Sequence, residues 1–403
     1  MLNHPNISPW PYYEADEIEA ARNTLMSGQV NYWTGDIGKK FESQYAKSVG
    51  KNYGIALSNG TVALELALRV LGIEEGDEVI VTSRSYVASA SCVVLLGAIP
   101  VFADVDLVSG NISVETIAPL ITSKTKAIIP VHIGGWPCDM IGIMALAEQH
   151  NLMVIEDCAQ AHGASIEGKA VGAWGHASIF SFCQDKIIST GGEGGMLLLD
   201  EETYFKKAWA YKDIGRSYDA VFHRQHPAGF RWLTETAGSN FRMTEFQAAI
   251  GLVQLAKLPK WIEKRNEHAE AIIEVLKPFD FLNAPTFINK PGNLNAYYRL
   301  YAIVREEYRS VILENETLRD FIVNQLVSAG VPCFFGACAE VYREKLFVDA
   351  GYQPKLALKN AHYFSNHAFC FLVHHTITTS EIQHITTLIK HVLAGVDKSI
   401  KFK

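Results

Sequence analysis

A lysine in an unusual setting is the first residue of this chain that could do chemistry. Lys186 follows the apolar stretch 178–182 and precedes the glycine-dense turn 191–195. These flanks predict a partly buried side chain. Because desolvation lowers the pKa of a lysine, its free amine can then form a Schiff base. A solvated surface lysine is the alternative interpretation of this segment alone.

An aspartate stands at the end of an earlier apolar run. The run 152–155 ends in Glu156 and Asp157, and Gln160 follows shortly after. In an open α/β sheet the carboxyl ends of strands face the ligand crevice, so Asp157 and Gln160 are candidates for holding a polar ligand. Acids at strand ends also serve as helix caps or lie in solvated turns, which is the alternative.

A small polar loop precedes the apolar helix candidate 61–71. Its residues, Ser58-Asn59-Gly60-Thr61, would lie where the free backbone N–H groups and the positive end of the helix dipole point outward. A phosphate could bind there, although Ser58 or Asn59 could also be an ordinary helix cap. No Walker loop or G-x-G-x-x-G motif accompanies it, so a nucleoside triphosphate or a dinucleotide is not indicated.

These three features together match the needs of pyridoxal phosphate. The aspartate would keep the pyridine nitrogen protonated, the lysine would bind the aldehyde, and the loop would hold the phosphate. Metal chemistry is not indicated: the chain has 14 histidines but no H-E-x-x-H motif. The pair His374-His375 would point to opposite faces of an extended segment, so we predict no metal site.

The elements that must position these residues alternate in type along the first half of the chain. Strand candidates are 78–82, 100–103, 127–131, 152–155, 178–182 and 195–199. Their alternation with helices predicts a mainly parallel, buried sheet with helices on both faces.

The second half of the chain has a different pattern of predicted elements. Strand candidates 298–304 and 369–373 and helix candidates 318–329 and 380–394 predict a smaller α+β unit, whose last helix opens with a capping box, Thr378-x-x-Glu381. A long helix through about residue 275 should carry the domain boundary. We therefore assign 1–255 to a large domain with an N-terminal segment and 256–403 to a small C-terminal domain.

Composition restricts the function classes. The 403 residues are 48% hydrophobic with a net charge of −7 and no basic footprint, which argues against nucleic acid as a partner. No apolar run approaches the ~20 residues that cross a bilayer, and no secretory signal is visible, so we expect a cytoplasmic protein without a membrane partner. Seven cysteines without a C-x-x-C pair indicate reduced thiols.

Several further motifs occur in a familiar order. They are Ser58-Asn59-Gly60-Thr61, Ser85-Tyr86-Val87-Ala88-Ser89, Pro130-Val131-His132, Glu156-Asp157-Cys158-Ala159-Gln160-Ala161, Ser181-Phe182 with Lys186, Gly192-Glu193-Gly194-Gly195 and Gly238-Ser239-Asn240-Phe241-Arg242-Met243. With them the chain resembles the DegT/DnrJ/EryC1/StrS family of PLP-dependent nucleotide-sugar aminotransferases. The resemblance implies the type I fold of aspartate aminotransferase: an α/β large domain with a mainly parallel seven-stranded sheet and a smaller C-terminal α+β domain.

The resemblance also implies roles for the cofactor site. Lys186 would hold pyridoxal 5'-phosphate as a Schiff base and then move the substrate proton, with pyridoxamine phosphate as the intermediate form. Asp157 would pair with the pyridine nitrogen and Gln160 would lie near the 3-oxygen. Tyr86 would stack on the ring. The phosphate would be bound by Gly60, Thr61 and Ser181, and by Asn240 of a neighbouring subunit, which makes the protein a homodimer with its active site at the interface.

The activity implied is transfer of an amino group from L-glutamate to a nucleotide-linked keto sugar. The expected substrate is UDP-4-keto-6-deoxy-N-acetylglucosamine, aminated at C4 for surface glycan biosynthesis such as lipopolysaccharide. C3 amination and a dTDP-sugar remain open. A sugar dehydratase of this family would carry His in place of Lys186, and a non-catalytic regulator would lack this chemistry altogether.

The substrate pocket is less well specified than the cofactor site. His223 and Arg231 lie in a polar stretch before Asn240 and could bind a diphosphate, or they could simply be solvated. The chain also departs from the family pattern at Trp136, where Gln is frequent, and at His375, where Pro is usual. Both departures concern the shape of the substrate pocket.

Overall fold

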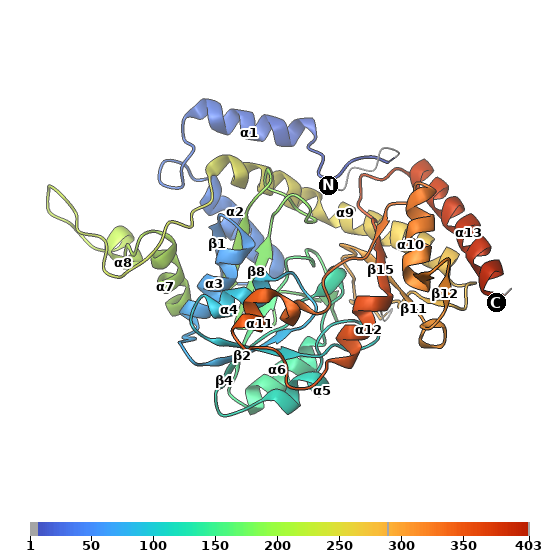
Figure 1. Cartoon of the computed structure of the whole chain (residues 1–403). Helices are drawn as coiled ribbons and strands as arrows, with labels where there is room; N and C mark the ends of the chain where they lie inside the picture. Colours follow the sequence, from blue (N-terminus) through green and yellow to red (C-terminus); the bar gives the residue numbers. More distant parts are fainter. Residues whose placement is uncertain (1–6, 288–289, 402–403) are drawn as a thin grey trace.

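The computed structural model describes residues 7–287 and 290–401, in which a large unit and a smaller C-terminal unit lie side by side. The helix α9 (Glu245–Leu276) runs from one unit to the other (Figure 1). Its first half packs in a large-unit core with Phe182, and its second half packs in the C-terminal core with Phe281. The helix is continuous through the predicted boundary at 255/256, which stays a prediction.

The large unit is built on a seven-stranded sheet. In spatial order the strands are β1 (Tyr53–Leu57), β9 (Gly195–Leu199), β8 (Ala177–Ser181), β5 (Met153–Asp157), β4 (Thr125–Ile129), β2 (Glu78–Thr82) and β3 (Ile99–Ala103). Strands β3, β2, β4, β5 and β8 are parallel, whereas β9 is antiparallel to both of its neighbours. The predicted mainly parallel sheet is therefore confirmed.

One strand has no counterpart among the strand candidates. The edge strand β1 was missed because a run of five residues, Tyr-Gly-Ile-Ala-Leu, has no periodicity that separates a strand from the end of a helix. Only pairing with β9 makes the segment extended. Its carboxyl end leads directly into the polar loop 58–61, so this strand positions the predicted phosphate site.

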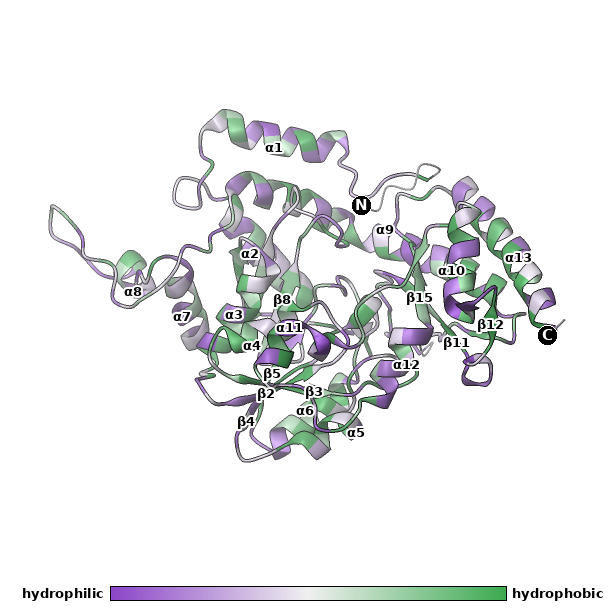
Figure 2. Ribbon diagram, in the orientation of Figure 1, coloured by the Kyte–Doolittle hydropathy of each residue, from purple (hydrophilic) through white to green (hydrophobic). Residues whose placement is uncertain are grey.

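Helices cover both faces of the sheet. On one face α3 (Gly60–Val70), α4 (Ala88–Val94) and α7 (Glu202–Lys212) pack against strand residues such as Ile55 and Ile179. On the other face α2 (Ile37–Val49), α5 (Val114–Ile117), α6 (Met140–Gln149) and the first half of α9 pack against residues such as Ala56 and Phe180. The strands are coloured as hydrophobic in Figure 2, as expected of a sheet covered on both sides.

The C-terminal unit has its own sheet and core. Its strands are β10 (Leu282–Asn283), β11 (Leu300–Val304), β15 (Ala368–Phe371) and β14 (Cys333–Phe334), all antiparallel. The helices α10 (Leu318–Ser328) and α13 (Thr379–Lys401) pack against them, and α12 (Lys359–His367) contacts β11 and β15. The short helix α11 (Lys345–Asp349) instead packs against the large unit through Phe347 (Figure 1). The predicted capping box is confirmed, because Thr378 N donates to Glu381 Oε2 and Glu381 N donates to Thr378 Oγ1.

The remaining elements lie at the periphery. They are α1 (Ala15–Ser27), which packs on α9, α8 (Tyr218–Phe222), and the two-stranded pairs β6 (Ser165–Ile166) with β7 (Lys169–Ala170) and β12 (Ile312–Leu313) with β13 (Glu316–Thr317). Across residues 7–287 and 290–401, no helix combines the length and the apolar character that a membrane span requires.

Candidate active site

A cavity of about 830 Å³ opens where the large unit meets the C-terminal unit. It collects seven of the residues selected from the sequence: Gly60, Thr61, Tyr86, Asp157, Gln160, Ser181 and Lys186. They come from the carboxyl ends of β1, β2, β5 and β8 and the loops that follow. Because the carboxyl ends of parallel strands meet at one edge of a sheet, residues far apart in the chain converge here.

Lys186 lies in the turn after β8 with its side chain 13% exposed. Its Nζ is 3.8 Å from Asp185 Oδ2 and 5.0 Å from the centre of the Tyr298 ring. Burial by itself lowers the pKa of Lys186, but Tyr298, Asp185 and Asp157 outweigh burial and leave the pKa above its usual value. The expected lowered pKa is therefore wrong for the protein alone, because Tyr298 from the C-terminal unit and the charges of Asp185 and Asp157 outweigh burial.

Asp157 ends β5 and is 4% exposed. Its Oδ2 accepts a hydrogen bond from Ser89 Oγ at 2.8 Å, and its Oδ1 accepts one from Ala159 N at 3.1 Å. Burial raises the pKa of Asp157, whereas the Ser89 and Ala159 hydrogen bonds and the charge of Lys186 oppose the rise. A buried carboxylate with two fixed donors suits a cationic partner such as a protonated pyridine nitrogen.

The start of α3 forms a tight polar cradle. Asn59 caps the helix by accepting from Val62 N at 3.0 Å, and the first N–H groups of a helix have no partner within it. A Cβ on Gly60 would lie 2.8 Å from Ser181 Cβ, and a Cβ on Gly195 would lie 2.3 Å from the Asn59 carbonyl oxygen. Only residues without side chains permit this approach, and the loop lines the cavity at the helix N-terminus, where an anion such as phosphate can bind.

A buried histidine that the sequence did not single out holds Ser181 in place. His162 Nε2 lies 3.0 Å from the Ser181 carbonyl oxygen, and its Nδ1 lies 2.7 Å from Tyr45 Oη. Burial lowers the pKa of His162 to about 3. The ring is thus neutral, with Nε2–H donating to Ser181 and Nδ1 accepting from Tyr45. Its proximity to the Asp157 motif in sequence was the available signal.

Gln160 and Tyr86 complete the ring-sized part of the cavity. Gln160 Oε1 accepts a hydrogen bond from Gly134 N at 2.8 Å, so the amide NH₂ is the group that remains to donate to a ligand. Tyr86 follows β2 and is 68% exposed along the cavity wall. An exposed aromatic ring beside Asp157 and Lys186 can stack on a planar ligand.

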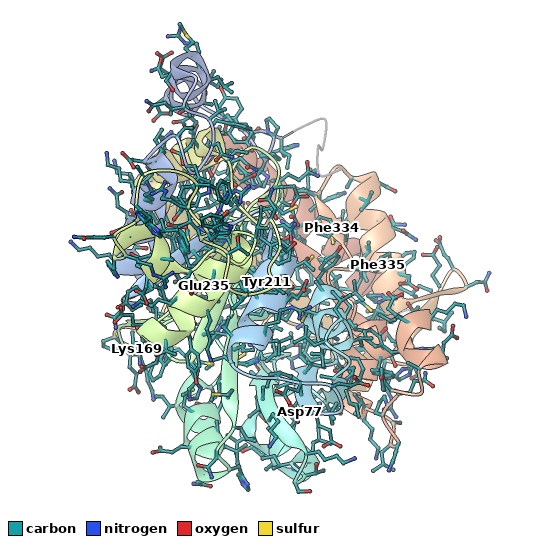
Figure 3. The ribbon with its side chains drawn as sticks, turned by 90° about the vertical axis from the view of Figure 1, so that its left-hand side faces the viewer. Asp77, Lys169, Tyr211, Glu235, Phe334 and Phe335 are labelled. Carbon is teal, nitrogen blue, oxygen red and sulfur yellow. The ribbon has the colours of Figure 1, made fainter. Side chains whose placement is uncertain are left out.

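The C-terminal unit supplies a wall that the sequence reading missed. Tyr298, Arg299, Tyr301 and Phe334 line the same cavity. Tyr298 Oη donates to Asp185, and Tyr301 Oη accepts from Ala337 N at 3.0 Å. Figure 3 labels Phe334 on the C-terminal unit, next to Phe335. Polar and aromatic residues at the entry of a strand, Tyr298-Arg299-Leu300-Tyr301, were the sequence signal.

Three predicted site residues do not join the cavity of their own chain. Asn240 is exposed and lies in a bridge with Asp213, away from Lys186. His223 is paired with Asp219 at 2.9 Å, and Arg231 is exposed on the segment between α8 and α9. This segment projects from the body of the molecule (Figure 1).

Next to Asp157, Glu156 is fully buried and fixes the end of β5. Its carboxylate accepts backbone hydrogen bonds from Gly172, Trp174 and Gly175 at 2.7–2.8 Å, and His132 Nε2 lies 3.3 Å from it. Burial would raise the pKa of Glu156, but His132 and the backbone donors hold it below the usual value. The ligand atoms of Glu156, His132 and Cys158 are close enough for a metal ion, yet those of Glu156 and His132 are already engaged in hydrogen bonds.

The residues present fit pyridoxal 5'-phosphate. The buried carboxylate of Asp157 suits a protonated ring nitrogen, the glycine-containing loop at the start of α3 suits the phosphate, and Lys186 lines the same cavity. When bound, this cofactor supplies an electron sink that makes a carbon next to an amine acidic. The type I fold and this site define a PLP-dependent aminotransferase.

Comparisons with known proteins give the same class. The sequence model of the DegT/DnrJ/EryC1/StrS aminotransferase family matches residues 11–390, and the chain belongs to this family. The aminotransferase of Psychrobacter cryohalolentis, a solved structure, superposes with a TM-score of 0.94 at 46% identity, covering 97% of this chain and 99% of that one.

Two relatives carry the name GDP-perosamine synthase. The protein of Escherichia coli O157:H7 is 43% identical over 62% of this chain and 65% of its own length, so the match spans just under two thirds of that relative. The Vibrio cholerae protein is 34% identical over 81% of this chain and 84% of its own length.

Proposed function

We propose that this protein transfers the amino group of L-glutamate to C4 of a nucleotide-linked 4-keto-6-deoxysugar. The observation that carries the chemistry is the pair Lys186 and Asp157 in one cavity, beside an anion cradle. Lysine rather than histidine at position 186 favours amination over the dehydratase alternative. The two relatives named GDP-perosamine synthase favour a GDP-linked sugar over the expected UDP-linked one.

The residues of this chain would divide the work as follows. Gly60, Thr61 and Ser181 would bind the phosphate and Asp157 would hold the ring nitrogen protonated. Lys186 would take the α-proton of glutamate and return one to the sugar carbon at the end. Tyr86 and Tyr298 would line the cavity around the reacting atoms.

A panel of keto sugars tests the substrate. Purified holoenzyme with L-glutamate should release 2-oxoglutarate with GDP-4-keto-6-deoxymannose, and more slowly or not at all with UDP-4-keto-6-deoxy-N-acetylglucosamine and the dTDP-linked sugar. NMR of the product identifies C3 or C4 as the aminated carbon. The Lys186→Ala variant is the blank. Preference for the UDP-linked sugar would reinstate that substrate, and a lack of turnover with every sugar would overturn the proposal.

We also propose that two copies share each site. Asn240, His223 and Arg231 lie outside the cavity of their own chain, and the projecting segment that carries Arg231 exposes Phe230 and Trp232 at 76% and 78%. Large aromatic residues exposed side by side favour burial against another protein surface. In a homodimer this segment would reach the partner's cavity.

Mixing two inactive variants tests shared sites. Lys186→Ala and Asn240→Ala chains, unfolded together and refolded, would form mixed dimers in which one site has both Lys186 and Asn240 intact. Activity should then return to about a quarter of wild type, because half of the dimers are mixed and each has one intact site. Light scattering gives the oligomeric state. A monomer, or mixtures as inactive as either parent, would contradict the shared site.

A further inference from the structure

Arg299 is a buried cation in the wall of the Lys186 cavity. It stands immediately before β11, in the C-terminal unit, and is 8% exposed. Lys186 and Asp157 come from the opposite side, at the edge of the large sheet. The charge of Arg299, with that of Lys186 and the hydrogen bond from Tyr298, holds the pKa of Asp185 below its usual value against the effect of burial. The guanidinium is thus within electrostatic reach of Asp185, the residue next to Lys186.

This guanidinium has no acidic partner. Over the described ranges 7–287 and 290–401, the Arg299 guanidinium makes no ion pair, and its one hydrogen bond is a long contact of 3.4 Å from Nη1 to the Tyr298 carbonyl oxygen. Its Cζ instead lies over two aromatic rings, at 4.4 Å from the centre of the Tyr298 ring and 5.2 Å from that of Phe334. These contacts leave most of the five guanidinium N–H donors free to bind a ligand.

Two other buried cations in the chain have the acidic partner that Arg299 lacks. Lys212 is paired with Glu42, and Lys51 with Asp200. Arg84 and Arg265 are buried without an acid, as Arg299 is, but neither lines the Lys186 cavity. A buried charge is costly unless an opposite charge accompanies it. Arg299 therefore favours an anion that enters the cavity.

We propose that Arg299 binds a carboxylate of the amino donor, a 2-amino dicarboxylic acid. This rests on the proposed function, which supplies such a donor. The guanidinium fork can take both oxygens of a carboxylate at once, and so fix the donor relative to Lys186. A nucleotide diphosphate is the other anion available. At 8% exposure and in contact with two aromatic rings, Arg299 admits a compact planar carboxylate more readily than a bulky diphosphate.

The two half-reactions test the two anions separately, because the first uses only glutamate and the second only the nucleotide-linked sugar. In the first half, holoenzyme is mixed with L-glutamate alone and the visible absorbance of the bound cofactor is followed. In the second half, the pyridoxamine phosphate form is mixed with the keto sugar alone. For Arg299→Gln we expect the KM for glutamate to rise about 10- to 150-fold, the loss typical of a charged hydrogen bond, with the sugar half unchanged. Arg299→Lys keeps the positive charge but not the planar guanidinium. Its KM for glutamate should therefore lie between those of wild type and Arg299→Gln.

Calorimetry gives a readout that does not depend on turnover. Glutarate, a dicarboxylate without an amine, should bind wild-type holoenzyme and lose at least tenfold in affinity for Arg299→Gln. Arg319→Gln is the matched control, because Arg319 also lies over an aromatic ring, at 4.6 Å from Phe335, but pairs with Asp320 outside the cavity. It should leave both half-reactions and glutarate binding unchanged.

Each result that would contradict the Arg299 proposal leads to a different conclusion. An Arg299→Gln enzyme with an unchanged glutamate half would overturn the carboxylate site and leave the proposed function intact. Loss confined to the sugar half would assign Arg299 to the diphosphate instead. An equal loss in both halves would make its role structural. A wild-type enzyme that does not react with glutamate would overturn the donor, and the Arg299 site with it.

Discussion

The indole of Trp10 donates a hydrogen bond from Nε1 to the carbonyl oxygen of Lys186 at 2.9 Å. Trp10 is 2% exposed and lies against His375 and Trp261, whose rings stack at 4.0 Å. Thus an N-terminal segment far from Lys186 in sequence holds its backbone. His375, a departure from the family pattern, helps to hold that segment in place.

Replacing Trp10 by Phe should loosen this support. The Lys186 carbonyl would lose a buried donor and the pocket some packing, so we expect the unfolding free energy to fall by about 1–3 kcal/mol. Turnover should fall several-fold because Lys186 is less fixed. Denaturant unfolding and 2-oxoglutarate release measure the two effects. Tyr12→Phe, on the same segment but 52% exposed, is the control. A variant equal to wild type in both would contradict the supporting role.

Ser89 should set the charge of Asp157. Its hydroxyl stabilises the ionised carboxylate and so opposes the rise in the pKa of Asp157 that burial causes. Ser89→Ala removes this donor, so the pKa of Asp157 should rise and the acidic limb of the kcat profile should move to higher pH. Ser89→Thr keeps the hydroxyl and should restore the profile, and Ser91→Ala on the same helix should not change it. An unshifted acidic limb in Ser89→Ala would refute this role.

Gly60 should be required for the phosphate and for little else. A Cβ there would lie 2.8 Å from Ser181 Cβ and would force the cradle open. We expect Gly60→Ala to weaken PLP binding by about 10-fold or more, since at least one charge-assisted hydrogen bond is lost. Absorbance titration of the apoprotein with PLP measures it. Gly395→Ala, in α13 with open space around it, should bind PLP normally. Normal PLP affinity in Gly60→Ala would place the phosphate elsewhere.

Glu156 should contribute stability that depends on pH. Its pKa in the fold lies below the ordinary 4.5, so the contribution is complete above that pH and is lost as the pH falls through the lower folded pKa. Glu156→Gln should cost about 1–3 kcal/mol at pH 7, because a charged acceptor of three backbone N–H groups is removed. The difference from wild type should shrink below pH 4.5. Thermal unfolding across this range, with exposed Glu148→Gln as the control, tests it; a constant difference would contradict the assignment.

The sequence by itself determined the fold class of the large unit and most residues of the candidate cofactor site. Alternating apolar runs specify a parallel sheet, and the carboxyl ends of parallel strands must share one edge. The motifs after those strands, with Asp157 and Lys186, therefore converge whatever the details of packing. Gly60 follows β1, which only pairing with β9 makes a strand.

Only the tertiary structure decided the other half of the site. Tyr298 and Arg299 belong to a second unit with its own core, and no periodic pattern in the chain states which face of one unit meets the other. The pKa of Lys186 shows the same limit. Local sequence indicates burial, which lowers this pKa, and it also places Asp185 beside Lys186. Tyr298, which raises the pKa more than Asp185 does, is brought close only by folding. Electrostatic interactions depend on the distances between groups in space, and the order of residues in the chain does not give those distances.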